Sequence, residues 1–246
     1  MKFSKRHFQF SSLLFLLLSG KTFCQQQPDS VLYKQSIDNL IALYKMQTGN
    51  AQHLYNGTEY AFLGHNINGT PYFESSEAQM GSVFYDGYLY ENIPMYYDMI
   101  NHVLVTKDYS NNYPVMLVQS KIKYFVLAGH RFINAGGENI SAAGTASQFY
   151  DELYHGNILM LARREKQLLL SSNAESNDSK YQQYNYYYVY KNETLYGISN
   201  ERTLLTVLKD KKDLVKKYIR ANRLNFKKDF ETAARNTIRY YDQLRN

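Results

Sequence analysis

Cysteine, tryptophan and paired histidines are scarce or missing in this sequence. Its 246 residues contain one cysteine, Cys24, and no tryptophan. A single cysteine excludes an internal disulfide and leaves no thiol after residue 24 for catalysis or for metal binding. None of the six histidines has the paired spacing of a metal-binding helix, and neither a G-x-S-x-G elbow nor a P-loop occurs. We therefore predict no catalytic residue, no metal site and no cofactor from motifs.

Long apolar runs are also missing, except for one stretch, Phe8–Leu18. It is well short of the ~20 residues that a membrane-spanning helix needs. Three basic residues precede it, and Thr22 and Cys24 place small side chains where a signal peptidase reads the chain. This order predicts a cleavable signal peptide over residues 1–24, with cleavage before Gln25. An uncleaved N-terminal anchor is the alternative.

Cys24 is a possible lipidation site because of its position in the chain. A lipoprotein signal has a small residue directly before the cysteine, whereas this chain has the bulky Phe23. We therefore expect an exported protein, periplasmic or extracellular, with a lipid anchor at Cys24 as the alternative. The rest of the chain has no cysteine, so its fold must be stable without disulfides.

Charge is unevenly distributed along the chain. Without residues 1–24, the net charge of +6 falls to +2, with 24 basic against 22 acidic residues. Residues 199–246 hold 13 Lys and Arg against 6 Asp and Glu. Such a segment is either a solvated basic face or a binding surface for an acidic partner, an anionic lipid or nucleic acid. We favour the solvated face and do not expect nucleic acid as a partner.

Tyrosine is the abundant aromatic residue, with 25 copies. Tyrosine is common in half-buried strands, which explains most of this enrichment. The run around Tyr186, Tyr188 and Tyr190 is also a candidate binding surface for a glycan or a peptide. Arg163 and Arg164 end an apolar run and are able to hold an anion, although a surface ion pair is the more usual role.

Turn signals divide the middle of the chain into short β-prone segments. Residues 81–133 repeat such segments about every ten residues, with Asp86-Gly87 as a hairpin turn and another turn near Asn101. Strands are predicted over 149–154 and 158–161, with a break at His155-Gly156-Asn157. A last hairpin joins 186–190 to Leu195-Tyr196 through a turn at Asn192-Glu193. The polar stretch Ser171–Lys180 predicts a loop.

Helical spacing appears at both ends. Residues 30–46 repeat apolar side chains every three or four positions, and so does the region of about 201–245, where Asp229 is a candidate cap. We predict an α+β fold. Its body is mainly an antiparallel β-meander, a curved sheet or partial barrel, with an N-terminal helix and a C-terminal helical segment. Residues 25–246 are expected to form a single domain.

Three segments carry a resemblance to a known group of proteins. They are Gly81–Asp98, Leu153–Arg164 (LYHGNILMLARR) and Lys211–Leu244, which contains YIRANRLNF. Together they resemble an uncharacterised family of exported proteins of Bacteroidota-type bacteria. The resemblance covers most of the chain after the signal segment. It implies an envelope or extracellular location and assigns no activity or site residue.

These observations favour a non-enzymatic envelope or extracellular protein with a structural or binding role. Its partner would be another envelope protein, a glycan or a lipid. A periplasmic carrier of lipid or another hydrophobic ligand is one alternative and requires an enclosed apolar cavity. A hydrolase of unrecognised type is the other, and it requires polar residues that converge in a cleft.

Overall fold

The computed structural model describes residues 36–37, 54–61, 67–107, 113–136, 140, 149–170 and 179–244. The chain divides into two compact units, 1–45 and 46–246. Ser36 and Ile37 are helical, as predicted for 30–46, and the other residues of that predicted segment lie outside the described residues. The predicted signal peptide, 1–24, also lies outside them. Among the described residues, no helix combines the length and the hydropathy needed to cross a membrane.

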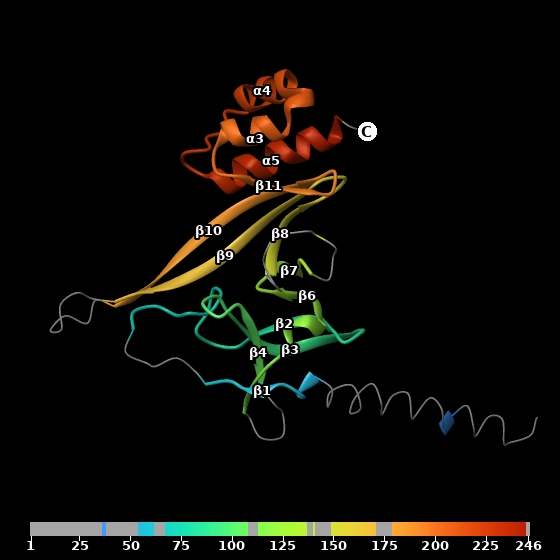
Figure 1. Ribbon diagram of the computed structural model, residues 1–246, viewed down its shortest axis with the longest axis vertical. Coiled ribbons are helices and arrows are strands. Elements are labelled where there is room, and N and C mark those ends of the chain that lie inside the picture. The colour runs from blue at the N-terminus through green and yellow to red at the C-terminus, as the bar shows by residue number, and fades with distance from the viewer. Residues whose placement is uncertain are drawn as a thin grey trace, which may run out of the picture. The chain divides into compact units, whose positions relative to one another are not determined.

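The described part of the second unit is built on one antiparallel sheet (Figure 1). Its described strands follow the order β1-β5-β4-β3-β2-β6-β7-β8-β9-β10-β11. Their bounds are β1 Thr58–Glu59, β2 Gln79–Tyr85, β3 Tyr88–Asp98, β4 Val103–Lys107, β5 Pro114–Met116, β6 Ile122–Leu127, β7 His130–Asn134, β8 Phe149–His155, β9 Leu159–Leu169, β10 Lys180–Lys191 and β11 Thr194–Ile198. The predicted α+β class with a curved antiparallel sheet is confirmed.

Consecutive described strands are neighbours in the sheet except at two connections, from β1 to β2 and from β5 to β6. Strands β2 to β5 follow one another, but β6 then pairs with β2 rather than with β5. The connection between β5 and β6 is short and contains a 3-10 turn, Gln119–Lys121. A short connection that passes three intervening strands requires the sheet to curl over β2–β6.

Tight turns set the strand boundaries. Asp86 and Gly87 both have positive φ, 51° and 86°, which is the backbone of a type I′ hairpin turn and confirms that prediction. Asn192-Glu193 is a second predicted turn with positive φ at both residues. Ala128-Gly129 has the same geometry and separates β6 from β7, a division that the sequence analysis missed.

Strands β9 and β10 are longer than predicted. Sequence patterns indicated strands over 158–161 and 186–190, whereas β9 continues to Leu169 and β10 begins at Lys180. Lys180 is therefore a strand residue and not part of the predicted loop, of which 171–178 lie outside the described residues. Residues 163–167 and 182–183 of the extension are polar on both faces, so they lack the apolar alternation by which strands are recognised.

Two apolar clusters pack against one face of the sheet. The first is rich in aromatic rings and lies among β2–β8, where Phe125 and Phe132 stack at 4.8 Å. The second joins β8–β11 to three helices, α3 Glu201–Val207, α4 Lys212–Ala221 and α5 Phe230–Gln243. Figure 1 shows these helices gathered beside β11.

The C-terminal helices are an integral part of this unit. Ile219 of α4 and Tyr241 of α5 are buried with Val189 of β10. Asp229 caps α5 by accepting a hydrogen bond from the Thr232 N–H, as predicted. The predicted helical segment packed on the sheet is confirmed, because its apolar stripes have sheet side chains as partners.

Candidate functional site

Strand β10 divides its tyrosines between the two faces of the sheet. Alternation places Tyr184, Tyr186, Tyr188 and Tyr190 on one face, which we call the outer face. Tyr187 lies on the opposite face, where its ring packs against Phe230 of α5 at 4.9 Å. Tyr184 and Tyr186 are exposed, whereas Tyr188 and Tyr190 are half-buried. The predicted Tyr186, Tyr188 and Tyr190 therefore do share one surface.

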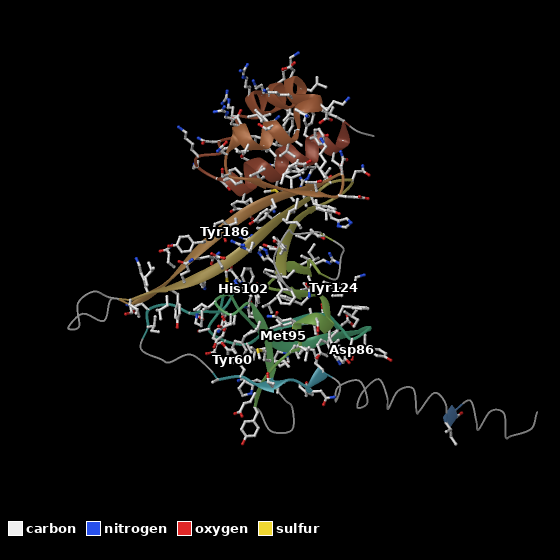
Figure 2. All side chains as sticks on the ribbon, viewed as in Figure 1. Tyr60, Asp86, Met95, His102, Tyr124 and Tyr186 are labelled. Carbon is white, nitrogen blue, oxygen red and sulfur yellow. The ribbon has the colours of Figure 1, made fainter. Side chains whose placement is uncertain are left out.

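The two candidate arginines lie on opposite faces. Arg163 of β9 is directly opposite Tyr186 of β10, and its guanidinium carbon lies 4.6 Å from the centre of that ring. Arg164 points to the helix side and is buried, so its assignment to the candidate surface is wrong. Ion pairing of Arg164 is confirmed, but a surface position is not, because α5 covers its side of the sheet. Figure 2 labels Tyr186 on the ribbon of β9 and β10.

A hollow of about 370 Å³ adjoins the outer tyrosines. Tyr186, Tyr188 and Gly197 line it on the outer face, and Phe230 lines it on the helix side. Gly197 lies opposite Tyr188 in the ladder between β10 and β11. A Cβ at this glycine would meet no described atom within 4 Å, so the missing side chain keeps the hollow open.

The hollow is next to an unpaired stretch of the β10 edge. Strand β11 pairs with β10 only from Tyr187 onwards. At the other end, the Tyr181 N–H donates to the Asn68 carbonyl, 3.2 Å away. Outward-facing groups alternate along an antiparallel strand, so the N–H and C=O groups of Gln183 and Asn185 also point away from β9. No described strand pairs with these two residues on that side.

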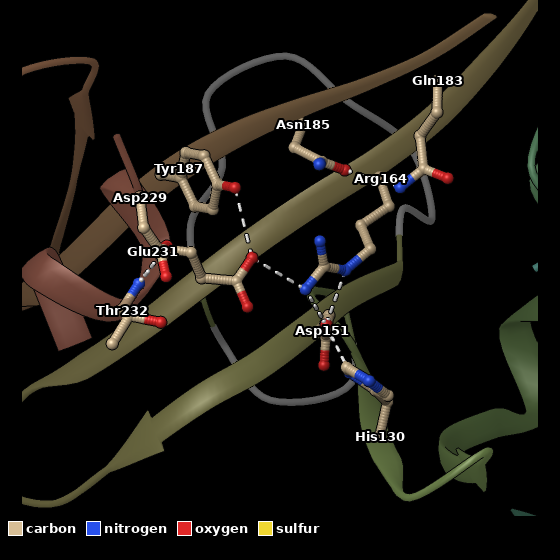
Figure 3. A network of polar contacts seen from close by, with 9 residues as sticks. All are labelled: His130, Asp151, Arg164, Gln183, Asn185, Tyr187, Asp229, Glu231 and Thr232. Carbon is tan, nitrogen blue, oxygen red and sulfur yellow. Dashed lines mark hydrogen bonds and ion pairs between the residues drawn. The ribbon is translucent and has the colours of Figure 1, made fainter. Parts of the chain in front are cut away.

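A buried polar network lies on the other face, between the two apolar clusters (Figure 3). Asp151 Oδ2 lies 2.8 Å from His130 Nδ1 and accepts a hydrogen bond from Arg164 Nε at 2.6 Å. The Arg164 guanidinium also donates to Glu231 Oε2 at 3.0 Å, and the Tyr187 hydroxyl donates to the same oxygen at 3.1 Å. The network therefore links β7, β8, β9 and β10 to α5.

Proton affinities in the network follow from these contacts. The hydrogen bond with Asp151 raises the pKa of His130 above its ordinary value of 6.5. Burial alone would lower the pKa of Arg164, but the carboxylates of Asp151 and Glu231 outweigh it and raise that pKa. Burial, followed by Glu231, raises the pKa of Tyr187 to about 12. The network thus holds charged arginine and neutral tyrosine near neutral pH.

The network has few features of a catalytic centre. A histidine next to an aspartate is one half of a nucleophile-activating arrangement, which also requires a hydroxyl or thiol within hydrogen-bonding distance. In the described part of the chain, Asp151 is the one group that hydrogen-bonds the His130 ring. The described residues also contain no group of three or more side chains able to hold a metal ion.

A second cleft, of about 790 Å³, lies among the C-terminal helices. It is lined by the start of α3, the end of α4 and the loop before α5. Arg202, Arg220, Arg223 and Lys227 surround it. The uneven charge of residues 199–246 pointed to this region, but the sequence did not reveal that separate segments enclose a cleft.

Sequence analysis also missed Gly197 and Asn185. A glycine inside a strand pattern is a signal for close approach or for an open site, and Gly197 carried that signal. Nothing in the local sequence marks Asn185, because its exposure depends on where β11 ends. No protein-family model, no curated protein and no solved structure matches this chain.

Proposed function

We propose that this chain is an exported, non-enzymatic binding protein that captures an extended peptide segment of a partner protein along the outer edge of β10. The observation that carries the proposal is the unpaired edge at Gln183 and Asn185, directly beside the hollow at Tyr186, Tyr188 and Gly197. An exposed edge strand accepts a further strand through its backbone groups, and pockets beside the edge select side chains.

The edge would supply affinity, and the hollow would supply selectivity. Gln183 and Asn185 offer backbone donors and acceptors at alternating positions, the pattern that an incoming strand requires. A side chain of that strand would enter the hollow over Gly197. Tyrosine suits such a surface because it gives a large, rigid contact area at low entropic cost, and arginine is also common among the residues that dominate binding energy. Arg163, placed over the Tyr186 ring, restrains that ring.

The alternatives have less support. A lipid carrier needs an enclosed apolar cavity, whereas the inner face of the sheet is filled by the two apolar clusters and the described clefts open at the surface. A hydrolase would centre on His130 and Asp151, yet neither residue lines these clefts. A glycan would use the tyrosine rings but not the backbone edge, and this difference separates it from a peptide.

A random-peptide display library, selected against the purified protein, tests the proposal. We expect enriched peptides that lose at least about tenfold in affinity for Gly197→Val and for Asn185→Pro. Valine fills the hollow without a clash, because the position is open. Proline removes an outward N–H that the β9 ladder does not use, and an edge position tolerates it. Amide exchange should slow at Gln183 and Asn185 when peptide binds.

Tyr113→Ala is the matched control, since Tyr113 is also exposed. It directly precedes β5, which is separated from β10 by seven strands in the sheet. The control variant should bind the selected peptides as the wild type does. A library that yields no binders would refute the proposal. Peptides that bind Gly197→Val and Asn185→Pro with wild-type affinity would refute it as well. Oligosaccharides that bind wild type and Asn185→Pro equally would assign the tyrosines to a glycan instead.

A further inference from the structure

The cleft among the C-terminal helices brings together four cations. Arg202 belongs to α3, Arg220 ends α4, and Arg223 and Lys227 lie in the loop that leads to α5. The same lining includes one carboxylate, Glu201. The cleft therefore has a local excess of positive charge that residues distant in sequence create jointly.

These four cations have no ion-pair partner among the described residues. Elsewhere in the same unit, the two buried cations Arg164 and Lys191 are neutralised by carboxylates. Lys191, for example, lies 2.8 Å from Asp210 Oδ1. All four cleft cations are exposed, so their charge is directed to solvent and is available to an anion.

Arg223 occupies a backbone position that normally favours glycine. Its φ is 51°, and it directly follows Asn222, the C-cap of α4. The Leu224 N–H donates to the Ile219 carbonyl at 3.1 Å, and the Arg223 N–H donates to the Arg220 carbonyl at 3.1 Å. This is the Schellman arrangement, in which glycine is the usual residue. An arginine here costs stability, and such a cost is typical of functional positions.

The inner wall of the cleft is apolar. Ile219 is buried, and Leu224 and Phe226 are half-buried. The Phe226 ring contacts the Phe230 ring at 5.9 Å. A ligand in this cleft would therefore meet guanidinium groups at the rim and an apolar surface below. Clefts of this size commonly hold small organic ligands.

We propose that this cleft binds a phosphate ester with an apolar or aromatic substituent. Guanidinium groups bind phosphate oxygens in pairs through their planar donors, and the apolar wall would take the substituent. Arg220 and Arg223 carry most of the phosphate binding. This site is separate from the β10 edge and goes beyond the peptide-binding proposal.

Isothermal titration of the full-length protein with three probes tests the inference. The probes are 1-naphthyl phosphate, which has both parts, inorganic phosphate, which has only the charge, and 1-naphthol, which has only the ring. We expect 1-naphthyl phosphate to bind at least about tenfold more tightly than either single-part probe. Its affinity should fall as salt concentration rises, because the charges are exposed.

A charge-matched pair of double variants separates the cleft from general charge. Arg220→Gln with Arg223→Gln should lower the affinity for 1-naphthyl phosphate by at least about tenfold. Lys217→Gln with Arg239→Gln removes the same charge from exposed helix positions outside the cleft lining and should leave the affinity unchanged.

Arg223→Gly distinguishes loss of binding from loss of fold. Glycine suits the positive φ, so the melting temperature should stay the same or rise while the affinity for 1-naphthyl phosphate falls. A variant that melts lower and binds as the wild type does would contradict the assignment of Arg223.

Sedimentation with vesicles identifies the source of the phosphate. Phosphatidylcholine vesicles with added phosphatidic acid represent a lipid headgroup, and pure phosphatidylcholine vesicles are the control. Vesicle binding that 1-naphthyl phosphate competes away supports a lipid source, whereas binding of the soluble probe alone supports a soluble ester. Three results would overturn the inference. The first is equal affinity of the two double variants for 1-naphthyl phosphate, and the second is equal affinity of the wild type for 1-naphthyl phosphate and 1-naphthol. The third is that the wild type binds neither 1-naphthyl phosphate nor the vesicles with phosphatidic acid.

Discussion

Arg164 of β9 and Glu231 of α5 form an ion pair, with 3.0 Å between Nη2 and Oε2, that joins the sheet to the last helix (Figure 3). The same guanidinium contacts Asp151 Oδ2 at 2.6 Å. Arg164 thus pairs with two carboxylates, one of them fully buried. Removing one partner from such a group leaves a buried charge without compensation, which costs more than the pair contributes when intact.

The first prediction concerns this arginine. Arg164→Met should lower the free energy of unfolding by about 3 kcal/mol, because Asp151 would stay buried without its cation. Lys121→Met is the control, because its ion pair with Asp86 is exposed and screened by solvent, and it should cost far less than Arg164→Met. Urea denaturation of both variants measures the difference. Equal losses of unfolding free energy in the two variants would show that the buried network does not stabilise the fold.

The second prediction concerns pH. The hydrogen bond with Asp151 raises the pKa of His130 above 6.5, so the folded state binds this proton more tightly than the unfolded state does. The resulting stability is fully present below the unfolded pKa and is lost as pH rises through the folded pKa. His130→Asn has no titrating ring at this position, so its free energy of unfolding lacks this dependence on pH. Urea denaturation over the neutral range should therefore show wild type losing its advantage over His130→Asn as pH increases.

His102 provides the internal check on that measurement. Burial lowers the pKa of His102, so its contribution has the opposite sign and favours higher pH. It is present in both proteins and cancels in the difference between them. A stability difference that does not change with pH would contradict the role of His130. Titration of the His130 ring by NMR should give a pKa above 6.5.

The third prediction contrasts two glycines. Gly87→Val should lower the free energy of unfolding by about 1 kcal/mol or more, because a β-branched residue resists a φ of 86°. Gly197→Val should not lower it, since that glycine has ordinary strand geometry and open space at Cβ. Thermal unfolding compares the two. A large loss for Gly197→Val would mean that the hollow is not open as described.

The fourth prediction concerns the C-terminal helices. Truncation after Asn200 removes α3, α4 and α5, and with them most of the cluster that covers Met160 and Val189. The exposed apolar face should give an insoluble or loosely packed product. Solubility and near-ultraviolet circular dichroism report on this. A truncated protein that unfolds cooperatively at the full-length melting temperature would show that the helices are an independent appendage.

The fifth prediction concerns export. The order of basic, apolar and small residues over 1–24 predicts cleavage before Gln25. Mass spectrometry of the protein recovered from its native cells should find an N-terminus near that residue. An intact Met1 in the cytoplasm would contradict export, and a diacylated Cys24 would establish the lipid-anchored alternative.

Much of the fold follows from local patterns. Asp86-Gly87 specified its hairpin because few residue pairs accept two positive φ values in succession. The stripe that contains Ile238 and Tyr241 indicated a helix with one face against a core. The extension of β9 and β10 escaped prediction because its central residues, 163–167 and 182–183, are polar on both faces. The pairing of β6 with β2 also escaped, since strand order across a sheet leaves no mark in local periodicity.

The sequence by itself determined the Asp86-Gly87 and Asn192-Glu193 turns, several short strands and the C-terminal helices, because turn geometry, strand alternation and helix periodicity are properties of neighbouring residues. It also brought Tyr186, Tyr188 and Tyr190 to one surface, since strand residues two apart must share a face. Only the tertiary structure decided that Arg164 is buried beside Glu231, that β11 ends early enough to leave Asn185 unpaired, and that Arg202 and Arg223 line one cleft. These relationships join residues far apart in the chain, and the packing of helices on the sheet fixes them.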